Sequence, residues 1–298
     1  MRKMLLMLVV VCVSIGFVLS GAALSADKVI VGAKNFTEQY IVGNMMAKLL
    51  EKAGYDVETK MGTGSTVTRK ALETGQTDMY PEYTGTAWSL YLENDSVITD
   101  PAELYEKVKA EDLEKNGILW LGLSNVNNTY AMAVTQEAAE EMGTTLSDMA
   151  AFVNEQPEDI IFGIDQEFYE RSDGFFGLAE HYGMEVDKDQ VRTMEVGLTF
   201  EAMMSGQVDV TMVFATDGKI QKYNLVVLED DRQFFPVYNL CVSARNEFIE
   251  EHPDVVDILA PIGDLTDSTM QKLNYEVDVN GKPAEMVAEE YLKEKGLL

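Results

Sequence analysis

Histidine and cysteine are nearly absent from this sequence. Its 298 residues include two of each, His181 and His252 together with Cys12 and Cys241. A structural zinc site of the common type needs four His or Cys ligands, and a serine or cysteine nucleophile needs a partnering base. Neither histidine has a nucleophile pattern nearby, and no phosphate-binding G-x-x-x-x-G-K-[ST] loop occurs. The sequence therefore predicts no catalytic residue, no metal ligand and no cofactor.

Basic residues are also scarce. There are 23 Lys and Arg against 51 Asp and Glu, which gives a formal net charge of −28. Such a charge repels phosphate backbones, so nucleic-acid binding is excluded. The apolar content of 46% is too high for a disordered acidic chain. The length suits a folded protein with two lobes of about 100–150 residues each.

One long apolar run stands at the N-terminus. A basic pair at 2–3 precedes the apolar residues 4–19, and small residues follow at Ala23 and Ser25. This pattern predicts a signal peptide over residues 1–25 that is cleaved on export to the periplasm. Cleavage would leave a single cysteine, which excludes an intrachain disulfide. The alternative is an uncleaved anchor, because the apolar segment is nearly long enough to span a bilayer.

Apolar runs that end in glycine alternate with helix patterns. Residues 29–32 have the pattern of a buried strand, and a helix is expected from Asn35 to Gly54. Residues 57–61 then predict another strand and residues 66–74 another helix. This alternation indicates an α/β fold.

The sequence also matches itself at a constant shift of 131 residues. A constant offset over more than 50 residues favours two lobes of like construction, although any α/β protein repeats strand–helix units. The matched positions are 30–32 with 161–163, the G-Q-x-D motif at 75–78 with that at 206–209, and Tyr83 with Phe214.

Two similar lobes predict a ligand cleft between them. The simplest organisation has a discontinuous lobe 1 of residues 26–131 and 216–298 and a lobe 2 of residues 132–215. Ligands of open α/β sheets gather beyond the carboxyl ends of the strands. Tyr83 and Phe214 both follow strand patterns, so we expect both rings to face this cleft.

Aromatic residues recur at these strand exits. Tyr83 and Tyr130 each lie among small polar residues, and Phe200 and Phe214 bracket the second G-Q-x-D motif. Four rings around a cleft can form a cage, because ring faces attract a cation with about 2 kcal/mol per desolvated contact. The composition leaves open that the same rings are ordinary core residues.

Several motifs resemble the periplasmic substrate-binding proteins of ABC importers for glycine betaine, carnitine and choline. They are VGAKNFTEQ at 31–39, YPEYTGT at 80–86, NTYA at 128–131 and TDG at 216–218, with weaker matches at 228–231, 235–236 and 273–275. The resemblance covers nearly the whole chain after residue 25. It implies a two-lobed α/β clamshell of the type II periplasmic class, usually monomeric. Its partners would be a permease and an ATPase on other chains.

The resemblance also implies a set of ligand-binding residues. Rings of the family's aromatic cage correspond to Tyr83, Tyr130, Phe200 and Phe214, and contacts to the ligand's carboxylate correspond to Lys34, Arg171, Thr86 and, in some relatives, Gln39. Phe200 and Phe214 depart from the family, which normally has tyrosine at both positions. Choline-restricted relatives have an acidic residue where this chain has Thr86.

Thr86 and the two basic residues favour a zwitterion over choline, since arginine can hold a carboxylate through two parallel bonds. The sequence thus predicts an exported receptor for glycine betaine or a related quaternary-ammonium zwitterion. The alternatives are the same fold with another small solute, such as choline, carnitine, ergothioneine or an amino-acid derivative, and an exported enzyme. Because the predicted site contains two of the scarce cations, we expect the acidic residues on the outer surface.

Overall fold

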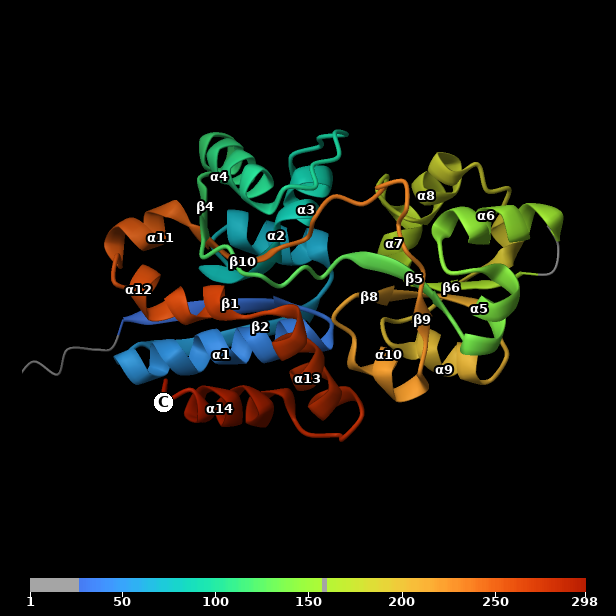
Figure 1. The fold of residues 1–298 in the computed structure, drawn as a ribbon. Helices are drawn as coiled ribbons and strands as arrows, with labels where there is room; N and C mark the ends of the chain where they lie inside the picture. Colours follow the sequence, from blue (N-terminus) through green and yellow to red (C-terminus); the bar gives the residue numbers. More distant parts are fainter. Residues whose placement is uncertain (1–26, 157–159) are drawn as a thin grey trace, which may run out of the picture.

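Two five-stranded sheets organise the chain, one in each of two lobes (Figure 1). The structure is a computed structural model that describes residues 27–156 and 160–298. The predicted signal peptide, residues 1–25, lies outside the described residues. Among the helices that are described, none is both long and apolar enough to cross a membrane.

The sheet of lobe 1 has the strand order β2-β1-β3-β10-β4. β1 runs parallel to β2 and β3, and β10 runs antiparallel to β3 and β4. The strands are β1 (Lys28–Lys34), β2 (Asp56–Thr63), β3 (Met79–Tyr83), β4 (Ile118–Leu121) and β10 (Leu240–Arg245). The residues of β3 are buried throughout, as expected for a strand at the centre of a covered sheet.

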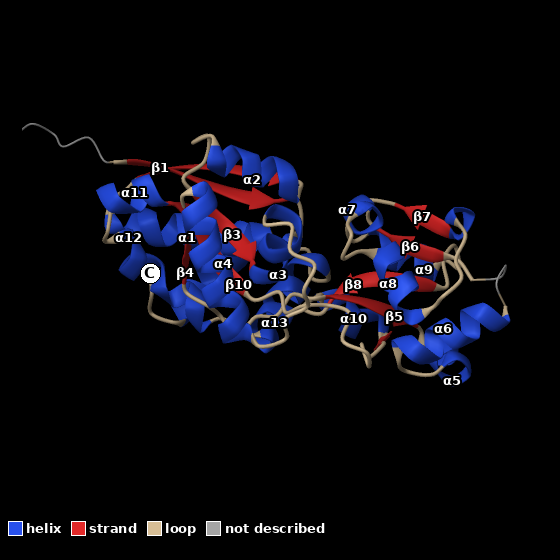
Figure 2. Cartoon of the chain, turned by 90° about the horizontal axis from the view of Figure 1, so that it is seen from above, coloured by secondary structure: helices blue, strands red, loops and turns tan. Residues whose placement is uncertain are grey.

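Helices cover both faces of this sheet (Figure 2). They are α1 (Thr37–Ala53), α2 (Ser65–Glu73), α3 (Thr84–Thr86), η1 (Ala87–Tyr91), α4 (Pro101–Asn116), α11 (Asn246–Glu251), α12 (Val255–Leu259), η3 (Ala260–Asp264), α13 (Asp267–Asp278) and α14 (Ala284–Glu294). α1 begins two residues after the predicted Asn35 and ends at Gly54, whose positive φ of 104° suits glycine.

The sheet of lobe 2 has the order β7-β6-β8-β5-β9. Its strands are β5 (Tyr130–Val134), β6 (Phe162–Ile164), β7 (Val191–Thr193), β8 (Val210–Phe214) and β9 (Val226–Val227). Its helices are α5 (Gln136–Met142), α6 (Leu146–Glu155), α7 (Gln166–Glu170), α8 (Phe175–Tyr182), η2 (Lys188–Gln190), α9 (Leu198–Met204) and α10 (Gly218–Tyr223).

The internal repeat predicted from the sequence has a direct structural counterpart. In lobe 1 the amide of Ile30 donates to Asp78 Oδ2 at 2.8 Å, and in lobe 2 the amide of Ile161 donates to Asp209 Oδ2 at the same distance. The repeated aspartate therefore fastens the residue before β3 to β1 in lobe 1, and the residue before β8 to the residue before β6 in lobe 2. The prediction of a two-lobed α/β fold is confirmed.

Two chain segments connect the lobes, and they lie side by side. The first leads from β4 to β5, and the second leads to β10. They are joined by a bridge between Asn127 and Asn239 and by a 3.1 Å bond from the Asn128 amide to the carbonyl of Tyr238. A paired double crossing of this kind is a natural hinge between two rigid sheets.

The return to lobe 1 comes later than the predicted boundary at residue 216. After β8 the chain continues in lobe 2 through α10 and β9, and β9 pairs with β5. The carbonyl of Glu229 still accepts a 2.9 Å bond from the lobe 2 residue Leu146. The strand β9 has two residues, too few to leave a periodic signal in the sequence.

Candidate functional site

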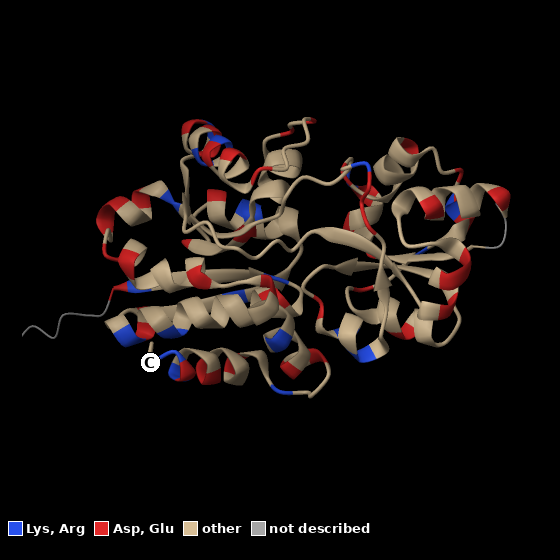
Figure 3. Cartoon of the chain, viewed as in Figure 1, with Lys and Arg blue, Asp and Glu red and all other residues tan. Residues whose placement is uncertain are grey.

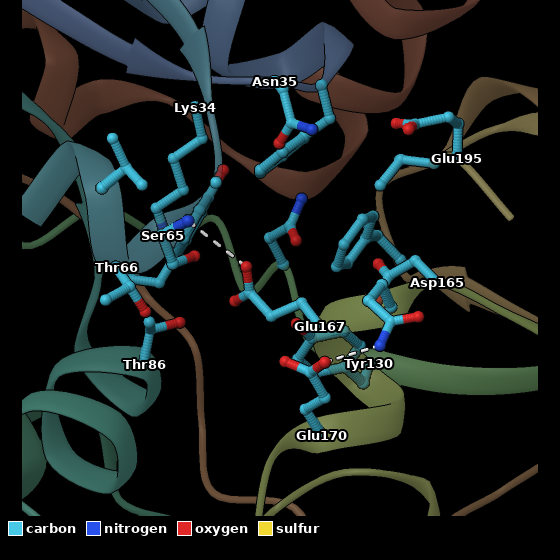
Figure 4. Close-up of a pocket in the computed structure, with 18 of the residues that line it drawn as sticks. Lys34, Asn35, Ser65, Thr66, Thr86, Tyr130, Asp165, Glu167, Glu170 and Glu195 are labelled. Atoms are coloured by element: carbon cyan, nitrogen blue, oxygen red, sulfur yellow. Dashed lines mark hydrogen bonds between the residues drawn. The ribbon is translucent and has the colours of Figure 1, made fainter. Parts of the chain in front are cut away.

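A cavity of 690 Å³ lies between the two lobes (Figure 4). Lobe 1 contributes the carboxyl ends of β1 and β3, the first turn of α2 and the end of α3. Lobe 2 contributes the ends of β6 and β8, the helix α7 and residues 193–196. The cavity therefore lies beyond the strand ends of both sheets, where the sequence analysis placed it.

Aromatic rings from both lobes form a continuous row along this cavity. Phe36 stacks on Phe214 across the lobe boundary, with ring centroids 5.1 Å apart, and lies 6.2 Å from Tyr83 on its own lobe. Phe214 in turn lies 5.2 Å from Tyr130. The structure thus brings together three of the four predicted cage rings, and all four rings of this row line the cavity. We call Tyr83, Phe36, Phe214 and Tyr130 the ring row.

Two rings at the cavity were missed in the sequence. Phe36 lies two residues after the end of β1, and Tyr238 lies in the second crossing segment with its ring edge-on to Tyr130 at 5.7 Å. Phe36 lies within the same motif as Lys34 and follows a strand end, so the rule that selected Tyr83 could also have selected it. Tyr238 has no such signal, because its place depends on the pairing of the two crossings.

Phe200 lies apart from the ring row. Its side chain stacks on Tyr223 with centroids 6.3 Å apart, and it lines a neighbouring 270 Å³ cavity that Phe36 also lines. Lys219 places its ammonium 5.6 Å from the ring centroid. Phe200 is in α9, which follows the positive-φ turn at Gly197 rather than a strand end. A direct role for Phe200 in the cage remains a prediction.

Lys34, at the end of β1, lies at the cavity but is already paired. Its ammonium donates to Glu82 Oε1 at 2.5 Å, and both side chains are almost fully buried. The same ammonium lies 5.2 Å from the ring centroid of Tyr83. Among the described residues that line the cavity, Lys34 carries the only positive charge.

Arg171, the other predicted cation, lies behind the ring row rather than in the cavity lining. Its guanidinium donates two parallel bonds to Asp173, at 2.6 and 2.7 Å, and a third to Glu167 at 3.1 Å. It also packs 5.6 Å from the ring centroid of Tyr130. A ligand carboxylate therefore reaches Arg171 only if one of these two acidic side chains moves.

The two remaining predicted contacts differ in position. Thr86 lines the cavity from α3, whereas Gln39 is fully buried behind it in α1. Gln39 accepts a 3.1 Å bond from the backbone amide of Lys34 and so fixes the end of β1. Its role in this structure is to position the strand end that carries Lys34.

Carboxylates crowd the lobe 2 wall of the cavity, where Figure 4 shows Asp165, Glu167, Glu170 and Glu195. Glu167 spans the cavity, since its Oε2 accepts a 3.3 Å bond from the amide of Ser65 at the start of α2. Acidic residues also cover the outer helices (Figure 3). The expectation that the acidic residues belong to the outer surface therefore holds only in part.

Asp165 is the buried member of this acidic group, with 4% of its surface exposed. Burial raises the pKa of Asp165 from 3.8 to about 6, although its carboxylate accepts a 2.6 Å bond from the amide of Phe168. Because the pKa is higher in the folded chain, the stabilisation from this proton is present below pH 4 and is lost as the pH rises to about 6.

Replacing Asp165 by asparagine is expected to raise the free energy of unfolding by roughly 2–3 kcal/mol at pH 8 and by only about 1 kcal/mol at pH 4.5. Asparagine can still accept the bond from Phe168, so the start of α7 is kept. Urea unfolding of both proteins between pH 4.5 and pH 8 measures the difference. A difference that does not vary with pH would contradict this account.

Comparison with known proteins places the whole described chain in one family. Residues 27–294 match the family of substrate-binding domains of ABC-type glycine betaine transport systems. The chain is 38% identical over 294 residues to a glycine-betaine-binding protein of Pseudomonas aeruginosa, covering 96% of this chain and 94% of that protein. It is 34% identical to the glycine betaine-binding protein YehZ of Escherichia coli, covering 91% and 92%.

A solved structure of a glycine betaine/carnitine/choline ABC transporter protein superposes with a TM-score of 0.73 at 32% identity. The match covers 90% of this chain and 99% of that one. Lactococcal OpuAC, in a closed conformation complexed with glycine betaine, shares the fold with a TM-score of 0.61 at 17% identity, covering 91% and 96%. On these matches, and on the two-lobed architecture, the chain belongs to the family of substrate-binding domains of ABC-type glycine betaine transport systems.

Proposed function

We propose that this protein is the extracytoplasmic receptor of an ABC importer and binds glycine betaine or a related quaternary-ammonium zwitterion between its lobes. The observation that carries this proposal is the ring row, in which rings of both lobes meet at the cavity. A quaternary ammonium has no N–H to donate, so ring faces suit it as well as carboxylates do. Contacts from both lobes make closure favourable when the ligand is present.

The carboxylate of the ligand would face lobe 1. Lys34 and Thr86 line that side of the cavity and offer an ammonium and a hydroxyl. Arg171 would join them only after Glu167 or Asp173 gave way, because both hold its guanidinium. Gln39 would act indirectly by holding the end of β1.

A cationic ligand such as choline is the second candidate. The four carboxylates of the lobe 2 wall outnumber the single positive charge of Lys34 in the cavity lining. A cavity with excess negative charge favours a ligand with a net positive charge over a zwitterion. A relative from Listeria monocytogenes, 34% identical, is named a carnitine transport binding protein, and carnitine, like glycine betaine, is a quaternary-ammonium zwitterion.

In the proposed pathway the receptor is exported by its signal peptide, binds its ligand outside the cytoplasm as a monomer, and delivers it to a permease driven by an ATPase. Both partners would be separate chains. The role is binding rather than catalysis, in line with the binding proteins among its relatives.

Isothermal titration calorimetry of the purified protein with glycine betaine, carnitine and choline tests this function. We expect glycine betaine to bind with a dissociation constant below the millimolar range and at least as tightly as choline. Tighter binding of choline would establish the second candidate. Absence of binding to all three at millimolar concentration would refute both.

A further inference from the structure

Glu38, in the first turn of α1, has a carboxylate buried at the boundary between the lobes, with 2% of the residue exposed. Its Oε1 accepts a 2.8 Å bond from the hydroxyl of Tyr83 and a 2.9 Å bond from the side-chain amide of Asn128. Its Oε2 accepts a 3.2 Å bond from the side-chain amide of Asn274 in α13. One carboxylate therefore holds a ring of the ring row, the first crossing segment and a helix of lobe 1.

The hydrogen bonds continue from these amides into lobe 2. Asn128 also donates to the hydroxyl of Thr216 at 2.7 Å, and Asn274 also donates to the carbonyl of Thr216 at 2.9 Å. Thr216 is fully buried and lies two residues after Phe214, the lobe 2 ring that stacks on Phe36. The network thus joins a cage ring of lobe 1 to the segment that carries a cage ring of lobe 2.

Burying a carboxylate at this junction costs free energy. Among the described residues, no Lys, Arg or His forms a salt bridge with Glu38, and burial raises its pKa while the hydrogen bonds oppose that shift. An uncompensated buried charge destabilises a fold unless all its acceptor sites are used. Here each partner is a donor, so the site requires a group that only accepts.

We propose that Glu38 is a positioning residue that couples the cage to the hinge: it orients Tyr83 toward the ligand and ties that orientation to the junction of the lobes. This inference rests on the proposed function for its ligand. Binding that stabilises Tyr83 in place then also stabilises the arrangement of Asn128 and Thr216. Ligand binding and lobe closure become linked through a side chain that does not itself need to contact the ligand.

The test compares Glu38→Gln, Tyr83→Phe and the double variant. Glutamine keeps the size but turns an N–H₂ group toward donors, and Tyr83→Phe removes only the hydroxyl bonded to Glu38. Spin labels at Glu106→Cys in α4 and Glu140→Cys in α5, both exposed, report the distance between lobes, since Cys241 is buried. Asp78→Asn is the control for the loss of a buried carboxylate of lobe 1, because Asp78 lies outside the cavity lining and is bonded to Arg245 and to the amide of Ile30.

We expect Glu38→Gln to weaken glycine betaine binding at least about tenfold and to broaden the distance distribution with and without ligand. Tyr83→Phe should show a smaller loss, and the double variant should bind no more weakly than Glu38→Gln, because both changes break the same link. Asp78→Asn should leave affinity and distances unchanged.

Losses that add in the double variant, or an unchanged distance distribution in Glu38→Gln, would overturn the coupling. If Glu38→Gln does not fold, an unchanged affinity and distance distribution in Tyr83→Phe would overturn it equally. If the wild-type protein binds no betaine, the proposed function fails by itself, while the unliganded distance distributions still decide whether Glu38 holds the hinge.

Discussion

Replacing Phe214 by alanine is expected to weaken the binding of glycine betaine about a hundredfold, which corresponds to about 2.7 kcal/mol. Phe214 is the ring that joins the two lobes in the ring row, with contacts to Phe36 at 5.1 Å and Tyr130 at 5.2 Å. Its loss removes one cation–π contact of about 2 kcal/mol and loosens two neighbouring rings. Phe200→Ala should change the affinity less than about threefold, because the Phe200 ring is buried against Tyr223 and does not line the 690 Å³ cavity.

These two variants form a matched pair, since both replace a buried phenylalanine of lobe 2. Calorimetry measures their affinities, and thermal unfolding shows that each is folded at the temperature of the titration. Phe214→Tyr, which restores the family's usual residue, should bind within about threefold of the wild type because its ring face is kept. Equal losses in both alanine variants would mean that Phe200 enters the cage on closure. Unimpaired binding by Phe214→Ala would refute the proposal that the ring row forms a cage for the ligand.

The sequence predicted the fold where a local signal was repeated. The aspartate that ends the G-Q-x-D motif occurs as Asp78 and Asp209, and its bond to β1 in lobe 1 and to the residue before β6 in lobe 2 explains why the two copies share one spacing. The return to lobe 1 had no comparable signal. β9 is held by pairing with β5, a contact between segments more than 90 residues apart, and such pairing leaves no trace in local periodicity.

The predicted rings also differ in whether a local strand signal placed them. Tyr83 and Phe214 end strands of different sheets, and in both sheets the carboxyl ends of the parallel strands face the cavity between the lobes, so their convergence there follows from the strand pattern. Phe200 was selected because it flanks the second G-Q-x-D motif and by the resemblance, without a strand end before it, and the helix α9 directs it into the neighbouring cavity. Position relative to a strand end was the better guide to the cavity.

Charge pairing at the site was the least predictable property. With 51 acidic residues against 23 basic ones, most cations in the chain can find a carboxylate. The partners of Arg171, Glu167 and Asp173, are local in sequence, and Glu167 could have been anticipated from its i, i+4 spacing. The partner of Lys34 lies on β3, and only the fold brings Glu82 to it.

Replacing Lys34 by methionine is expected to lower the free energy of unfolding by about 3–5 kcal/mol, because it leaves Glu82 as a buried charge without its partner. Glu82 is fully buried and also accepts bonds from the hydroxyls of Tyr80 and Tyr91 and from the amide of Tyr83. The same substitution removes the only positive charge from the described lining of the cavity. Loss of binding in this variant alone would therefore not separate folding from recognition.

The double variant Lys34→Met/Glu82→Gln separates the effect on folding from the effect on ligand recognition. Glutamine can still accept from the amide of Tyr83, and its N–H₂ group can donate to the hydroxyls of Tyr80 and Tyr91, so most of the lost stability should return. A charge-assisted hydrogen bond contributes about 1.5–3 kcal/mol. If Lys34 holds the carboxylate of a zwitterion, the folded double variant should therefore bind glycine betaine at least about tenfold more weakly than the wild type. Its affinity for choline should change little. Urea unfolding measures the recovered stability, and calorimetric titrations with glycine betaine and with choline measure the two affinities. An unchanged ratio of the two affinities would show that the ammonium of Lys34 serves only to neutralise Glu82, and the excess of carboxylates on the lobe 2 wall would then make a cation the preferred ligand.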